Sequence, residues 1–144
     1  MYSLALILFL AGAATMELGA YLQHRFLWHR GGPLAAWHAS HHRSPEPIGS
    51  SNDVLAFVNA GCCMAACLIS YVLEASHIFS FVTGVTFYGM MYLICHDGFV
   101  HGRWNLRHFA PTNSLYFRRL ENAHLKHHAQ PTCNYGFFVH ALFA

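Results

Sequence analysis

Ten of the thirteen histidines fall into four short clusters. Two clusters have the spacing HxxxxH and two have HxxHH, and the two spacings alternate along the chain. Imidazole nitrogen binds Fe, Zn, Cu and Ni alike, so the clusters indicate metal binding without selecting the ion. The four clusters are His24 and His29; His38, His41 and His42; His96 and His101; and His124, His127 and His128.

The spacing within the clusters predicts how the imidazoles are shared. In HxxHH, separations of three and four residues place every imidazole on one helical face, as a shared metal site requires. In HxxxxH, five residues turn a regular helix about 140° past a full turn, so these pairs need a helix end, a π-bulge or two different metals. Ten ligands exceed the capacity of one ion, so we expect a dinuclear centre with about five histidines per metal.

Three carboxylates lie close to the histidines in the sequence. Asp97 follows His96 directly, and Glu121 precedes His124 by three residues on the same helical face. Either carboxylate could orient a ligand imidazole or bind metal itself, so both are candidate site residues. Glu17 lies inside an apolar segment, where an ionisable group is a functional candidate and a protonated, neutral Glu is the alternative.

The remaining histidines, His77, His108 and His140, belong to no cluster. A lone histidine is more often satisfied by hydrogen bonds than bound to metal. We therefore exclude these three from the predicted site.

The composition favours a membrane protein. Of 144 residues, 55% are hydrophobic and only 10% are charged, whereas soluble domains are less apolar and more charged. The net charge of +2 is too small to indicate a nucleic-acid partner. The length suits a single integral-membrane domain over residues 1–144. Five cysteines with no CxxC pair predict packing residues rather than a disulfide framework.

Three apolar segments are long enough to cross a bilayer. We expect spanning helices at Tyr2–Tyr21, Val54–Leu73 and Ala75–Cys95, and a further, polar helix at Leu115–His128. The last segment, Cys133–Ala144, is too short to span and is either interfacial or cut off. The fold class is therefore all-α, a polytopic membrane protein with three to four transmembrane helices.

The third expected span carries two features of its own. Gly84 and Gly89 predict close approach of another helix. The methionines and aromatic residues of Phe87–Leu93 could line a pocket for an apolar substrate, with ordinary helix packing as the alternative.

Three spans place all four histidine clusters on one side of the membrane, together with every Lys and Arg. The positive-inside rule makes this side cytoplasmic, or its organellar equivalent. The basic residues on this side are Arg25, Arg30, Arg43, Arg103, Arg107, Arg118, Arg119 and Lys126. A patch of five of them could dock an acidic electron carrier or contact anionic lipid head groups: Arg103, Arg107, Arg118, Arg119 and Lys126.

Several segments together resemble the non-haem di-iron β-carotene 3-hydroxylases. The HDGFVHGRW stretch and the order of the four histidine clusters distinguish this family from the broader fatty-acid and sterol hydroxylase group. The segments that carry the resemblance are MELGAYLQHRFLWH (Met16–His29), WHASHHR (Trp37–Arg43), ND (Asn52–Asp53), YGMMYLICHDGFVHGRW (Tyr88–Trp104) and RRLENAHLKHHA (Arg118–Ala129).

The resemblance implies a membrane oxygenase that hydroxylates carotenoid β-ionone rings at C3, converting β-carotene through β-cryptoxanthin into zeaxanthin. It implies two irons held by the ten clustered histidines, dioxygen, and electrons from a ferredoxin-type donor. The expected location is the bacterial inner membrane or a plastid membrane. Two departures stand out: family members usually continue past Ala144, and they are commonly drawn with four membrane helices.

Other functions remain open at this point. A fatty-acid, sterol or ketocarotenoid hydroxylase would use the same histidines, because they report the reaction and not the substrate. A membrane haem-binding electron carrier would need one histidine pair per haem deep in the bundle, which ten histidines at one face do not offer. A metal transporter would need ionisable residues through its spans, and only Glu17 lies well inside one.

Overall fold

The computed structural model describes residues 2–43 and 49–143. These residues form helices joined by turns, with no strand among them. In chain order the elements are α1 (Tyr2–Gln23), the π-helix η1 (His24–Trp28), α2 (Pro33–His38), α3 (Ser51–Val72), α4 (Ser76–Tyr92), the π-helix η2 (Leu93–Val100), the 3-10 helix η3 (Arg103–Phe109), α5 (Leu115–Ala129) and the 3-10 helix η4 (His140–Leu142).

Within the described ranges, three helical segments are long and apolar enough to cross a membrane: Ser3–Trp28, Ser51–Val72 and Ser76–Val100. Large apolar side chains point outward from them, as lipid-facing positions require, and Phe57 is 74% exposed. The predicted all-α membrane fold is therefore confirmed. The side of the membrane on which the histidines lie stays a prediction.

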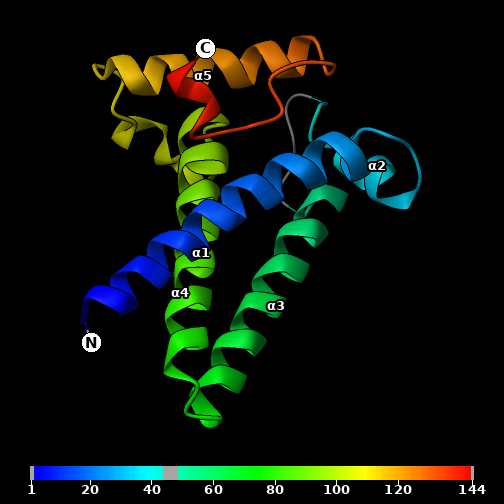
Figure 1. The fold of residues 1–144 in the computed structure, drawn as a ribbon. Helices are drawn as coiled ribbons and strands as arrows, with labels where there is room; N and C mark the ends of the chain where they lie inside the picture. Colours follow the sequence, from blue (N-terminus) through cyan, green and yellow to red (C-terminus); the bar gives the residue numbers. More distant parts are fainter. Residues whose placement is uncertain (1, 44–48, 144) are drawn as a thin grey trace.

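The three spans enclose a space near one end of the bundle. Helices α3 and α4 form a hairpin and diverge away from its turn, while α1 crosses α4 obliquely (Figure 1). Glycines permit this crossing, because a Cβ on Gly84 would lie 1.9 Å from the Phe9 carbonyl oxygen and one on Gly12 would lie 2.0 Å from that of Phe81. The prediction for Gly89 is wrong, since a Cβ there would meet nothing within 4 Å.

Helix α5 lies across the wide end of the hairpin (Figure 1). Its start is capped by Ser114, whose side chain accepts a hydrogen bond from the Phe117 backbone N–H at 3.3 Å. The chain then returns beneath α5 and buries Phe137 and Ala141 against Leu120. The described part of the last segment forms only the short η4, so it contains no fourth spanning helix.

Candidate metal centre

Both HxxxxH pairs lie on π-helical turns. His24 is the first residue of η1 and His29 directly follows its end, while His96 lies within η2 and His101 directly follows its end. The His101 backbone N–H donates to the His96 carbonyl oxygen at 3.0 Å, the five-residue step of a π-turn. This wider turn brings the two rings of each pair to a centroid separation of 4.8 Å. Of the arrangements that the sequence left open, the structure has the π-bulge.

The ten clustered histidines form two groups of five. In each group, one ring nitrogen per residue lies within 4.8 Å of the others. Each group draws on three of the four histidine clusters. Group 1 is His24, His29, His38, His42 and His127, and group 2 is His41, His96, His101, His124 and His128.

Each HxxHH motif is divided between the two groups, so the expectation that its imidazoles share one site is wrong. In α5, His124 and His128 belong to group 2, whereas His127 belongs to group 1. Consecutive residues of an α-helix point in directions about 100° apart around the helix axis. Adjacent histidines such as His127 and His128 therefore reach different groups, and α5 bridges both.

The imidazoles turn the same nitrogen, Nε2, toward one another. In group 1 the Nε2 atoms of His24 and His38 are 3.0 Å apart, and in group 2 those of His41 and His96 are 3.1 Å apart. Further Nε2 pairs lie at 2.8–3.2 Å, including His128 with His124 and His42 with His38. The inner surface of each group is thus made of convergent ring nitrogens.

Partners at the outer nitrogen, Nδ1, fix the tautomer of several rings. Carbonyl oxygens can only accept, so the rings of His24 and His127 donate Nδ1–H to the backbone oxygens of Tyr135 at 2.9 Å and Cys133 at 2.6 Å. His38 makes the same contact with Asn52 Oδ1 at 2.9 Å. Each of these rings therefore directs an Nε2 lone pair inward, as a metal ligand does.

Five of the clustered histidines that lie beyond the spans are held neutral, namely His29, His38, His124, His127 and His128. Burial, together with His127, lowers the pKa of His29 to about 4. Burial and then His41 lower the pKa of His128 to about 2. Burial also lowers the pKa of His38, His124 and His127. Neutral imidazole is the form that binds metal.

The donor sets fit two metal ions. Neutral imidazoles whose lone pairs converge at about 3 Å repel one another unless a cation lies between them. The sets contain only ring nitrogen, which suits a borderline transition metal better than Mg²⁺ or Ca²⁺. Five imidazoles per group also exceed the four ligands of a closed structural zinc site.

The two candidate carboxylates have different positions. Asp97 Oδ1 accepts from His96 Nδ1 at 2.5 Å, so it can orient this imidazole. Glu121 belongs to neither group and instead pairs with Arg107 at 2.6 Å. Glu17, inside the first span, accepts hydrogen bonds from the Tyr88 hydroxyl at 2.6 Å and the Val139 backbone N–H at 3.0 Å.

The three histidines that were set aside lie outside both groups. His77 is in the first turn of α4, at the hairpin end of the bundle. His108 is exposed on η3. The Nε2 atom of His140 lies 2.8 Å from the Oδ1 atom of Asn134.

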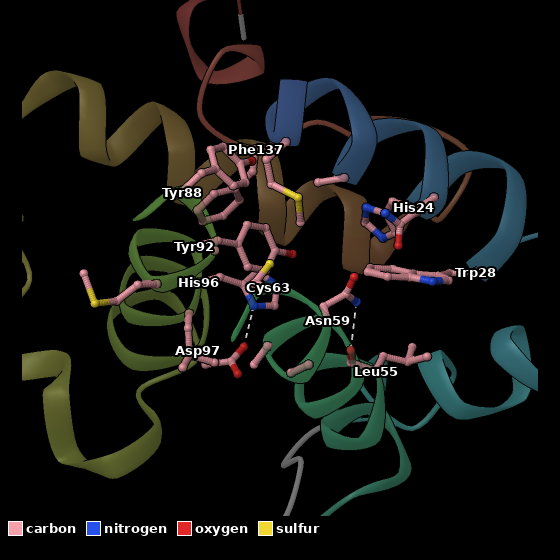
Figure 2. Close-up of a pocket in the computed structure, with 18 of the residues that line it drawn as sticks. His24, Trp28, Leu55, Asn59, Cys63, Tyr88, Tyr92, His96, Asp97 and Phe137 are labelled. Atoms are coloured by element: carbon pink, nitrogen blue, oxygen red, sulfur yellow. Dashed lines mark hydrogen bonds and ion pairs between the residues drawn. The ribbon is translucent and has the colours of Figure 1, made fainter. Parts of the chain in front are cut away.

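A mostly apolar cavity of about 350 Å³ reaches both groups. Helices α1, α3 and α4 line its sides, and His24 of group 1 and His96 of group 2 lie at its polar end (Figure 2). From the predicted stripe Phe87–Leu93, Tyr88, Gly89, Met90, Tyr92 and Leu93 line it.

The α3 side of this cavity, which includes Leu55, Asn59 and Cys63, is not predicted by the sequence pattern. Asn59, a polar amide inside an apolar span, was the one signal for this side, and nothing distinguishes Leu55 or Cys63 from the rest of the span. The groove-facing positions of a membrane helix cannot be told from its lipid-facing ones by hydropathy, because both are apolar.

Convergent imidazoles at the end of an apolar cavity within a helical bundle define the class of integral-membrane hydroxylases. The family model described as fatty acid hydroxylase matches residues 9–142, so the chain belongs to this family. It is a hydroxylating oxidoreductase. No solved structure matches the chain.

Curated relatives include bacterial and plant proteins. The chain is 38% identical over 125 residues to a protein named beta-carotene hydroxylase from Paracoccus sp. (strain PC1), covering 85% of this chain and 74% of the relative. It is 38% identical over 136 residues to beta-carotene 3-hydroxylase 1, chloroplastic, from Arabidopsis thaliana, covering 89% of this chain and 42% of the relative. A beta-carotene hydroxylase from Pseudescherichia vulneris is 37% identical over 116 residues, covering 80% of this chain and 62% of the relative.

Proposed function

We propose that this protein hydroxylates carotenoid β-ionone rings at C3, converting β-carotene through β-cryptoxanthin to zeaxanthin. The observation that carries the proposal is the apolar cavity whose polar end is formed by histidines of both groups. A ring held in this cavity lies beside both groups while the apolar walls keep water away. The names of the curated relatives support the choice of substrate. The family match over residues 9–142 supports a single domain.

The ten histidines of groups 1 and 2 would hold two irons, five imidazoles to each. Bound there, the irons would supply the redox chemistry for inserting an oxygen atom of O2 into an unactivated C–H bond, which zinc cannot supply. The protein holds the imidazoles in place through their outer nitrogens. Tyr135, Cys133 and Asn52 perform this for group 1, and Asp97 performs it for His96 of group 2.

The cavity walls position the substrate. Tyr92 stacks on His96 at a centroid distance of 4.6 Å, and Phe137 packs against both rings. Trp28 and Leu55 form the opposite wall (Figure 2). The flat, rigid rings of Trp28, Tyr92 and Phe137 and the mostly apolar lining suit a hydrocarbon ring.

The electrons would come from a ferredoxin-type donor. Arg118, Arg119 and Lys126 on α5 offer a basic surface close to the histidine groups, and complementary charge steers acidic carriers to such surfaces. Anionic lipid head groups would use the same residues. We place the protein in a bacterial inner membrane or a plastid membrane, with the histidines on the cytoplasmic or equivalent side.

Pigment analysis of β-carotene-producing bacterial cells that express this chain tests the proposal. We expect β-cryptoxanthin and zeaxanthin with the wild type and only β-carotene with His127→Ala. Unchanged β-carotene despite confirmed membrane expression would contradict the substrate assignment. The family description favours fatty acids as the second candidate, so membrane lipids from the same cells are analysed for hydroxylated acyl chains.

A further inference from the structure

Three charged residues form a buried chain that ends at a histidine of group 2. Arg103 donates from Nη1 and Nη2 to both oxygens of Asp53, at 2.7 and 2.8 Å. Its Nη1 also lies 3.3 Å from Asp97 Oδ2. Asp97 Oδ1 in turn accepts from His96 Nδ1 at 2.5 Å. The order is therefore Asp53, Arg103, Asp97, His96.

The chain is well enclosed. The side chain of Arg103 is 5% exposed, that of Asp97 is 7% exposed, and that of Asp53 is 14% exposed. Two-pronged contacts between a guanidinium and a carboxylate fix orientation as well as distance. Ion pairs shielded from water in this way are screened by salt much less than surface pairs.

The local backbone is shaped to aim Arg103 at this position. Gly102 before it has a positive φ of 67°, and Trp104 and Asn105 after it have φ values of 53° and 59°. Residues without glycine's freedom rarely adopt this conformation unless the surrounding structure holds them there. The Trp104 ring packs 5.2 Å from the Arg103 guanidinium carbon. The turn therefore directs Arg103 back toward the start of α3.

We propose that Arg103 and Asp53 are positioning residues that hold Asp97, and through it His96, in the orientation that group 2 requires. Asp97 lines the cavity, and its two carboxylate oxygens have different partners, His96 at Oδ1 and Arg103 at Oδ2. Arg103 binds Oδ2 of Asp97, so Oδ1 of Asp97 remains hydrogen-bonded to His96 Nδ1–H. The Nε2 atom of His96 then points at the Nε2 atom of His41, 3.1 Å away. The inference rests on the proposed metal-binding function.

Cobalt(II) titration of the purified full chain in detergent tests this role without any turnover. The bound ions are counted by mass spectrometry of the metal, and their ligand environment is read from visible absorption. We expect two ions per wild-type chain. In Arg103→Gln and in Asp53→Asn, the affinity for one ion falls about 10- to 100-fold and its absorption changes, as is usual when a residue that orients a ligand is lost.

Three further variants sharpen the test. Asp97→Asn is expected to reproduce the effect, and Arg103→Lys, which keeps the charge but loses the two-pronged contact, is expected to fall between Arg103→Gln and the wild type. Arg107→Gln is the matched control, because it removes a neighbouring arginine whose carboxylate partner, Glu121, belongs to neither group. It is expected to bind both ions as the wild type does.

The outcomes separate the two proposals. Lowered thermal stability with wild-type cobalt affinity and absorption in Arg103→Gln and Asp53→Asn would overturn the positioning role and leave a purely structural one. A wild-type chain that binds no metal would overturn the proposed function, and this inference with it. Asp53→Asn keeps the shape of the side chain, so it decides the question if Arg103→Gln does not accumulate in the membrane.

Discussion

Gly84 of α4 lies directly against the backbone carbonyl of Phe9 in α1, where a Cβ atom would be 1.9 Å from the oxygen. A reciprocal contact places Gly12 of α1 against the Phe81 carbonyl of α4. The two helices therefore meet backbone to backbone. Helix α1 leads directly to His24 of group 1, and α4 leads through η2 to His96 of group 2. The contact between α1 and α4 therefore sets the distance between these two histidines.

Replacing Gly84 by alanine is expected to weaken this crossing. The added methyl group has to push apart two backbones, and overpacking of this kind costs about 1–3 kcal/mol. Gly89→Ala in the same helix is the matched control, because a Cβ there meets nothing within 4 Å. Denaturant unfolding in detergent measures the difference, and equal stability of the two variants would contradict the reported contact.

Glu17 ties the C-terminal segment to the bundle through the Val139 N–H and to α4 through Tyr88. Glu17→Ala leaves both donors without this acceptor, a loss of about 1–3 kcal/mol in local stability. We expect amide hydrogen exchange at Val139 to become roughly 10- to 100-fold faster. Glu74→Gln, at the exposed hairpin turn, is the control. Unchanged exchange in Glu17→Ala would show that the segment is held by its apolar contacts alone.

Loss of one histidine from either group is expected to abolish hydroxylation. His41→Ala affects group 2 and His127→Ala affects group 1. Both variants should insert into the membrane normally and contain less iron per chain than the wild type, measured by elemental analysis beside product chromatography. His108→Ala, exposed on η3, should retain iron and activity. Wild-type turnover by His41→Ala or His127→Ala would contradict the ligand assignment.

Filling the cavity is expected to reduce turnover without removing metal. Ala60 lines the cavity from α3, so Ala60→Leu places an isobutyl group where the substrate ring would lie. Ala65→Leu, at an exposed position of the same helix outside the cavity lining, is the control. Product formation and iron content are measured for both. Equal product from the two leucine variants would move the substrate site elsewhere.

The membrane helices could be predicted from the sequence because span length follows directly from bilayer thickness. The three spans lie where hydropathy predicts them, and α5 covers the polar helix expected at Leu115–His128. The gathering of the histidine clusters at one end was also predictable, since it follows from counting the spans. These properties depend on neighbouring residues only.

The rest of the site depends on contacts between distant residues. Asp53 and Arg103 are fifty positions apart in the sequence, and no spacing rule joins them. Glu121 has the correct helical position to meet His124 but pairs with Arg107, whose side chain reaches α5 from η3 and also lies over the Phe117 ring. The division of each HxxHH motif between two groups depends on how α5 and the turn after α2 are rotated against the bundle, and tertiary packing alone decides this rotation.

The divergence of α3 and α4 has a consequence for the order of events in catalysis. The cavity between them accommodates about 350 Å³, enough for one end group of a long polyene, while the remainder of the molecule stays among the lipid tails. A symmetric substrate with a ring at each end therefore presents its rings one at a time. The enzyme should act distributively. A molecule hydroxylated on one ring leaves the cavity, reorients in the bilayer and competes with unmodified substrate before its second ring is hydroxylated.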